Sequence, residues 1–119
     1  MALITLKGKE YELKFTYKSL RALEAHYNKG VFNVLSEEGM DKLETINVFL
    51  WACLKREKDF KNKNVDQVVD LLDDAFEDGD LTLEQLTKAL ETAFTESTLL
   101  KGVQQAQAVE GAVEGDQKN

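Results

Sequence analysis

The 119-residue sequence contains no proline, one cysteine and one histidine, and each scarcity excludes a kind of structure or site. The single cysteine, Cys53, cannot close a disulfide within the chain, which fits a reducing compartment. The single histidine, His26, has no Cys or His cluster with which to hold a metal ion. The absence of proline suits a helix-rich chain. We therefore expect no metal, no cofactor and no disulfide framework.

Long apolar runs are missing as well. No stretch approaches the ~18 apolar residues that a membrane span needs. The N-terminal segment turns polar after six residues and then alternates, unlike a signal peptide. We expect a soluble, cytoplasmic protein that makes no membrane contact.

Basic residues are outnumbered, because 15 Lys and Arg face 22 Asp and Glu, and the formal net charge is −7. That balance argues against binding to nucleic-acid phosphates. The charges are also segregated: a basic cluster precedes a segment, residues 64–87, that holds eight acids and no base. One interpretation is two solvated surfaces; the other is a basic segment that meets the acidic helix of a neighbouring molecule. The basic cluster consists of Lys55, Arg56, Lys58, Lys61 and Lys63.

The best-defined stretch, Ile4 to Tyr27, reads as a β-hairpin that leads into an amphipathic helix. A two-residue loop at Gly8-Lys9 would form a type II′ turn and pair Leu6 with Tyr11. A loop at Lys7-Gly8 would set Leu6 against Lys9, so the first register is preferred. Either register places the same apolar side chains on one face of the hairpin. These are Ile4, Leu6, Tyr11, Leu13 and Phe15.

Apolar residues at three-four spacing predict four main helices. The first follows the N-cap Thr16 and ends near Tyr27, with Tyr17 on its apolar stripe and Gly30 as a left-handed C-cap. A short apolar piece, residues 31–35, forms one or two helical turns. The second main helix begins at a capping box from Asp41 to Glu44.

The third and fourth main helices are capped by Asn64 and Thr82, each followed by Gln three residues later. The short turn between them predicts an antiparallel helical hairpin. The fold class is therefore α+β and predominantly helical: an N-terminal β-hairpin followed by about four main helices. Residues 1–101 form one domain, and residues 102–119 form a flexible, disordered polar tail.

One segment, Asp74 to Gln85, is similar to an EF-hand calcium loop aligned on Gly79. Its third position is Phe76 and its twelfth is Gln85, where oxygen ligands and a bidentate Glu are required. A helix C-cap followed by a capping box explains the same residues. The sequence also has no GxSxG, P-loop or GxGxxG pattern, and Cys53 lies on an apolar helix face, so we expect no enzymatic activity.

The hairpin and the helices together resemble the tail assembly chaperones of long-tailed bacteriophages, in the group found in phages and prophages of Gram-positive bacteria. The resemblance covers roughly residues 3–100. It rests on the run from Ile4 to Phe15, on Tyr27 and Gly30, and on the aromatic helix around Phe49 and Trp51.

This resemblance implies a non-enzymatic role in virion assembly. Such chaperones bind the tape measure protein, keep its long hydrophobic helices soluble until the tail tube assembles, and are absent from the mature virion. Further implied partners are the major tail protein and a second copy of the chain, all in the cytoplasm of the bacterial host. Two alternatives remain: an acidic bacterial or prophage interaction module of another role, and a degenerate EF-hand-like calcium module.

The hairpin supplies the predicted partner-binding residues, because two strands cannot complete a sheet and leave open edges. Trp51 lies off the main apolar stripe of its helix, so it either completes the core or anchors a partner. The predicted partner-binding residues are Ile4, Leu6, Tyr11, Leu13, Phe15 and Trp51, with the groove between the first and second main helices.

Overall fold

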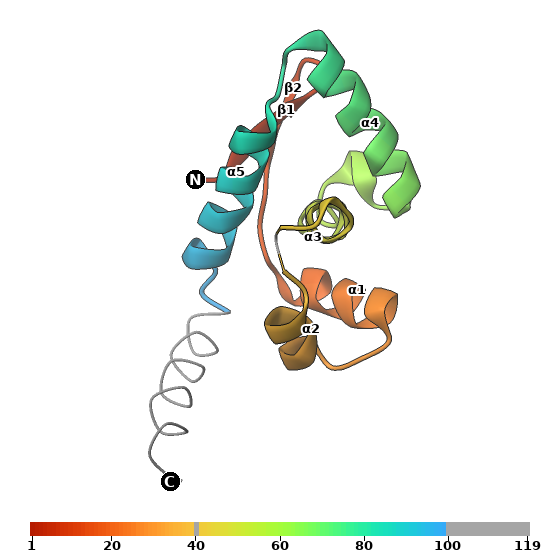
Figure 1. Cartoon of the computed structure of the whole chain (residues 1–119), viewed down its shortest axis with the longest axis vertical. Helices are drawn as coiled ribbons and strands as arrows, with labels where there is room; N and C mark the ends of the chain where they lie inside the picture. Colours follow the sequence, from red (N-terminus) through yellow and green to blue (C-terminus); the bar gives the residue numbers. More distant parts are fainter. Residues whose placement is uncertain (40, 100–119) are drawn as a thin grey trace, which may run out of the picture.

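A computed structural model describes residues 1–39 and 41–99 and consists of a β-hairpin followed by helices (Figure 1). The antiparallel strands are β1 (Leu3–Leu6) and β2 (Lys9–Glu12). The helices are α1 (Tyr17–Tyr27), α2 (Val31–Glu37), α3 (Leu43–Cys53), the 3-10 turn η1 (Lys58–Phe60), α4 (Val65–Asp78) and α5 (Leu83–Glu96). The predicted α+β, predominantly helical class is confirmed. The predicted polar tail, residues 102–119, lies outside the described residues.

The hairpin has a different register from the preferred one. Ile4 pairs with Tyr11 and Leu6 pairs with Lys9, so the loop is Lys7-Gly8 and the Gly8-Lys9 prediction is wrong. Both loop residues have positive φ, 53° and 74°, as in the type I′ turn that matches the twist of paired strands. Lys9 tolerates its place opposite Leu6 because its amine reaches the carboxylate of Asp59 at 2.7 Å.

The apolar face of the hairpin is as predicted, because the shift between the two loops preserves the alternation. All five side chains are buried, and β1 packs against both α4 and α5. The helices α4 and α5 therefore do not lie along one another as a simple helical hairpin. They diverge from the turn at residues 79–82, and the strands lie between the end of α4 and the start of α5 (Figure 1).

Helix α3, which is apolar over a broad face, is the centre of the core. It contacts α1, α4 and α5, and its residues Val48, Leu50 and Ala52 are fully buried. It begins at Leu43 rather than at the predicted cap Asp41. The Lys42 backbone N–H donates to the Gly39 oxygen, with nitrogen and oxygen 3.5 Å apart, and Lys42 gives no side-chain cap.

The other helix ends follow local chemistry. The N-caps at Thr16, Asn64 and Thr82 are confirmed, each with a reciprocal capping box. Helix α1 ends at a left-handed Asn28, with φ 56°, so the prediction of Gly30 as its C-cap is wrong. Asn adopts this conformation more readily than most residues, and Gly30 instead begins α2 with an extended backbone.

One predicted core position is on the surface. Tyr17 was placed on the apolar stripe of α1, but its side chain is 69 % exposed. The stripe is carried instead by Leu20 and Leu23, while buried Ser19 closes the capping box. Among the described residues, no helix is long and apolar enough to cross a membrane.

Candidate functional site

Phe15 lies between the end of the hairpin and the start of α1. Its side chain joins this connecting segment to α3 and to α5. Its ring makes edge-on contacts with Phe49 of α3 and Phe94 of α5, with centroids 6.0 and 5.9 Å away. The ring is only 4 % exposed, yet it lines two grooves at the surface. Phe15 therefore places the connector between β2 and α1, residues 13–16, beside both grooves.

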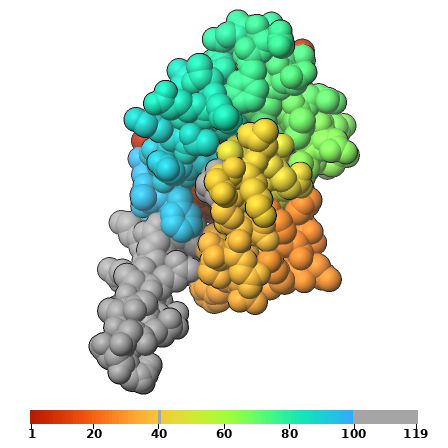
Figure 2. Space-filling view, in the orientation of Figure 1, coloured from red at the N-terminus to blue at the C-terminus, as the bar shows by residue number. Residues whose placement is uncertain are grey.

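The first groove, called the apolar groove, has a volume of about 380 Å³ and lies between α5 and the α2–α3 region. Figure 2 shows these two sides in blue and in orange to yellow. Glu38, Glu91 and Thr95 also line it. Its apolar side chains are Phe15, Leu35, Phe49, Leu90 and Phe94.

The sequence builds one wall of the apolar groove through helical spacing. Leu90 and Phe94 are four residues apart on α5, so they project from the same side of the helix. Glu91 and Thr95 follow each of them by one residue and are exposed. The groove is thus an apolar floor with a carboxylate at its edge, which suits the binding of an apolar side chain.

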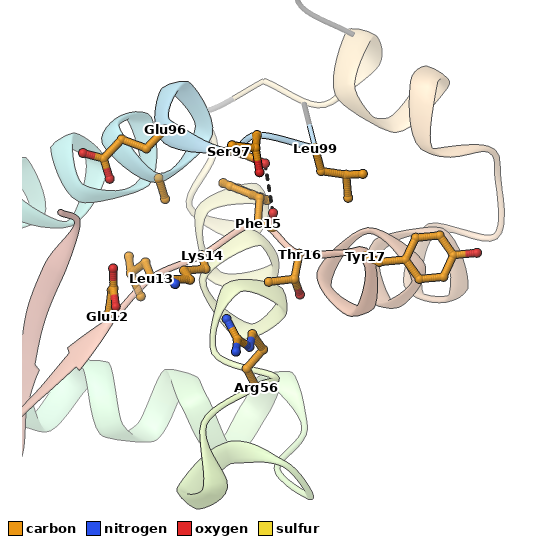
Figure 3. A pocket seen from close by; sticks show the side chains of 12 residues that line it. Glu12, Leu13, Lys14, Phe15, Thr16, Tyr17, Arg56, Glu96, Ser97 and Leu99 are labelled. Atoms are coloured by element: carbon orange, nitrogen blue, oxygen red, sulfur yellow. Dashed lines mark hydrogen bonds between the residues drawn. The ribbon is translucent and has the colours of Figure 1, made fainter. Parts of the chain in front are cut away.

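The second groove, called the polar groove, has a volume of about 520 Å³ and lies between residues 12–17, which include the connector, and the end of α5 (Figure 3). Two acids and two bases line it: Glu12, Glu96, Lys14 and Arg56. The Ser97 hydroxyl donates a hydrogen bond to the Phe15 backbone oxygen at 3.0 Å, drawn dashed in Figure 3.

The side chains that could act as nucleophile or base are engaged in the fold or lie away from these grooves. Ser97 is engaged with the backbone, and the ring of His26 lies elsewhere, 5.9 Å from the ring of Trp51. Burial raises the pKa of the Cys53 thiol well above its ordinary value, which keeps it protonated and a poor nucleophile. Within residues 1–39 and 41–99, no group of three or more His, Cys, Asp or Glu side chains could hold a metal.

The segment that is similar to a calcium loop has other structural roles. Asp74 and Asp78 belong to α4, and the Asp74 carboxylate forms an ion pair with the Lys7 amine at 3.0 Å. Gly79 is the left-handed C-cap of α4. The Gln85 side-chain oxygen accepts the Thr82 N–H at 2.9 Å. These are the C-cap and the capping box that the alternative interpretation predicted.

The predicted partner-binding residues of the hairpin all lie in the core. Ile4, Leu6, Tyr11 and Leu13 are each at most 8 % exposed, and the domain's own helices cover them. Among the predicted residues, Phe15 alone lines the apolar groove. Their role in binding a partner stays a prediction.

Trp51 completes the core edge and fastens α3 to the segment before α4. Its indole N–H donates to the Lys63 backbone oxygen at 2.8 Å. The Lys55 ammonium lies 4.9 Å from the ring centroid. The first two predicted main helices are α1 and α3, and they pack against each other on this side of the molecule. The predicted role of the groove between them in binding stays a prediction. The indole is half-buried, and a role as partner anchor stays a prediction.

A polar cluster fixes the hairpin to η1. The Asp59 carboxylate accepts hydrogen bonds from the Lys9 amine at 2.7 Å and from the Tyr11 hydroxyl at 2.8 Å. The Lys9 contact, then the Tyr11 contact, lower the pKa of Asp59 below its ordinary value. The Tyr11 ring also meets the buried Phe60 edge-on, with centroids 4.9 Å apart. This cluster holds the hairpin in the register that delivers Phe15 to the grooves.

Sequence reasoning did not identify the apolar groove as a site. Leu90 and Phe94 belong to the fourth predicted main helix and Phe49 to the second, and no pattern in the sequence joins them in one surface. Leu35 lay in a short apolar piece with no assigned neighbour. These residues meet only in three dimensions, so the one sequence signal was an aromatic at each of three separate elements: Phe15, Phe49 and Phe94.

Comparisons of this chain with known protein families, with curated proteins and with solved structures find no match.

Proposed function

We propose that the protein is a non-enzymatic tail assembly chaperone of a phage or prophage, which binds the tape measure protein and keeps it soluble in the bacterial cytoplasm. The observation that carries this proposal is the apolar groove around Phe15, an open apolar surface on an otherwise acidic molecule. The resemblance of the hairpin and first helix to this chaperone family supports the same assignment.

The size of the apolar groove suits a holding role. A volume of about 380 Å³ accommodates a few side chains of the partner at a time. Burial of one large aliphatic side chain contributes about 1.5–3 kcal/mol. Each such contact is therefore weak and reversible, which fits a chaperone that must leave before the tail is finished. A long partner would need several copies along its length.

The acidic balance serves the same role. A net charge of −7 keeps the chaperone and its complexes apart in solution through mutual repulsion. Glu91 at the groove edge places one of those charges beside the bound segment, whereas the Glu38 carboxylate is already paired with the Lys29 amine at 2.9 Å. In the complex, acidic side chains of the chaperone would then face the solvent at places where the partner alone exposes apolar surface.

Co-expression with the tape measure protein of the genome that encodes this chain tests the proposal. The wild-type chain is expected to hold the tape measure protein in the soluble fraction and to co-purify with it. Phe94→Asn removes an aromatic from the groove and should lower the soluble tape measure protein several-fold. Phe32→Asn is the matched control, because Phe32 on α2 is 62 % exposed and lies outside the groove.

A second variant separates docking from folding. Thr95→Lys adds a long charged side chain at the groove edge, where Thr95 is exposed, and removes no core atoms. It should lower co-purification while leaving the circular dichroism and melting of the free chain unchanged. An insoluble tape measure protein beside a soluble, folded wild-type chain contradicts the proposed function.

A further inference from the structure

Helix α4 carries a wider apolar stripe than the core can bury. Val68, Leu72 and Ala75 are buried, whereas Val69 is half-buried and Phe76 is 37 % exposed. These outer residues form one edge of the stripe. Apolar residues that a domain leaves uncovered beside its core are typical of interaction surfaces.

The uncovered edge of α4 continues onto two other helices. A groove of about 160 Å³, called the α4 groove, lies between α4 and the first turns of α3 and α5. Leu43 at the start of α3 is 61 % exposed, and Leu83 at the start of α5 is 47 % exposed. The apolar lining includes Leu43, Val69, Leu72, Phe76, Leu83 and Leu86. Among the described residues, the α4 groove and the apolar groove have no lining residue in common.

An acidic stripe runs beside the α4 groove. Asp66, Asp70, Asp73 and Glu77 follow one another at four-three-four spacing, which places them on one side of α4. All four are exposed, and Asp73 itself lines the groove. No ion pair in the described part of the chain involves any of these four carboxylates. The stripe therefore presents uncompensated negative charge to whatever occupies the groove.

We propose that the α4 groove docks an amphipathic helix of a partner protein, with the partner's apolar ridge against Leu43, Phe76 and Leu83 and its lysines or arginines against the acidic stripe. A helix that lies in a groove presents apolar residues at three-four spacing, so a single ridge can contact side chains from all three helices that line the α4 groove. The basic flank is set by charge complementarity with four carboxylates on one side.

Charge and the exposure of apolar side chains argue against four other occupants of the α4 groove: a nucleic acid, a membrane, a segment of the same chain and a second copy of the chain. Nucleic acids and anionic membranes are repelled by the acidic stripe. The chain's own segment 102–119 holds three acids and one lysine, so it also lacks the basic flank. A second copy offers the basic cluster at residues 55–63, but the aromatic of that cluster, Phe60, is 1 % exposed and gives no apolar ridge.

Two designed helical peptides of ~18 residues, long enough for measurable helicity, test the proposal with the full-length chain. They share one leucine ridge and differ only in flanks of lysine or of glutamate. Titrations followed by backbone amide NMR are expected to show the lysine peptide binding about tenfold more tightly than the glutamate peptide. The difference is no larger because each exposed ion pair contributes little to the binding free energy. Its shifts should centre on Leu43, Phe76 and Leu83.

Two matched pairs of variants make the test specific. Leu83→Asn should weaken the lysine peptide several-fold, whereas Leu99→Asn, at a leucine of nearly equal exposure outside the groove, should not. Asp73→Lys should weaken the same peptide, whereas Glu10→Lys, at an exposed acid of the hairpin, should not. These four substitutions change exposed positions, and melting curves verify the fold of each variant.

Several results would overturn the proposal. Equal affinity for the two peptides removes the charge argument, and shifts centred on the Phe15 side place the binding elsewhere. Absence of binding up to about 1 mM peptide leaves no useful affinity. Sedimentation that shows a dimer of the free chain, converted to monomer by Leu83→Asn, assigns the surface to a second copy instead. None of these results depends on the proposed chaperone function, which is tested at the apolar groove.

Discussion

The hydroxyl of Ser97 donates a hydrogen bond to the backbone oxygen of Phe15, at 3.0 Å, and so joins two residues that lie 82 positions apart. Both residues are buried. The bond fixes the end of α5 to the connector between hairpin and α1, at the point where the Phe15 ring meets Phe49 and Phe94. The geometry of both grooves at Phe15 depends on this attachment.

Removal of that hydroxyl should destabilise the fold. In Ser97→Ala the Phe15 oxygen loses this donor in a buried place, which costs about 1–3 kcal/mol of unfolding free energy. Thr87→Ala on the same helix is the control, because its hydroxyl only bonds to the Leu83 and Glu84 oxygens within α5. Urea denaturation compares the two. A Ser97→Ala variant as stable as the control would show that the attachment is unimportant.

The hairpin turn makes a prediction that separates the two registers. Lys7 has φ 53°, a left-handed conformation that Asn tolerates better than Gln. Lys7→Asn and Lys7→Gln both delete the exposed ion pair with Asp74. The Asn variant should therefore be more stable than the Gln variant by about 0.5–1 kcal/mol. Equal midpoints in thermal melts would favour the type II′ turn at Gly8-Lys9.

The Asp59 cluster predicts an acid-dependent contribution to stability. The Lys9 and Tyr11 contacts lower the pKa of Asp59 in the folded state below the ordinary value of 3.8. A lowered folded pKa stabilises the fold above the unfolded pKa, and that stabilisation is lost as the pH falls through the folded pKa. The wild-type chain should thus be more stable to unfolding than Asp59→Asn at pH 7, and this difference in stability should disappear in acid.

Denaturation of the two chains across the acid range measures this gap. Asp80→Asn is the matched control, since Asp80 is exposed and takes part in none of the described ion pairs. A gap between wild type and Asp59→Asn that is constant from neutral to strongly acidic pH would show that the cluster does not favour the ionised carboxylate.

The indole of Trp51 should contribute through its N–H. Trp51→Phe keeps an aromatic ring on α3 but removes the donor to the Lys63 oxygen, 2.8 Å away. We expect a loss of about 1 kcal/mol of unfolding free energy and faster hydrogen exchange in the segment before α4. A variant that binds a partner less well without any loss of stability would instead favour the anchor role.

The sequence predicted those parts of the fold that local chemistry determines. The caps Thr16, Asn64 and Thr82 are specified by side chains three residues apart, and the apolar face of the hairpin by simple alternation. The turn was wrong because two registers share that alternation, and the choice depends on Asp59, 50 residues away, which receives Lys9. Asn28 and Gly30 compete for one left-handed position, and both are plausible from sequence.

The candidate site was much less predictable. The hairpin residues were recognised as an apolar surface, but whether helices of the same chain cover them is a property of the whole fold. The core beneath α4 ends before it reaches Phe76, which is 37 % exposed, and the spacing of apolar residues does not reveal that limit. The apolar groove requires Phe15, Leu35 and Phe94 to converge from three elements, which no spacing in the chain encodes.

The most direct test of the chaperone assignment is site-specific photo-crosslinking to the tape measure protein in co-expressing cells. A photoreactive residue at position 95 faces the apolar groove, and one at position 32 lies on α2 outside it. Binding through the groove predicts a strong crosslink to the tape measure protein from position 95 and little from position 32. Crosslinks of equal yield from both positions, or from position 32 alone, would contradict it.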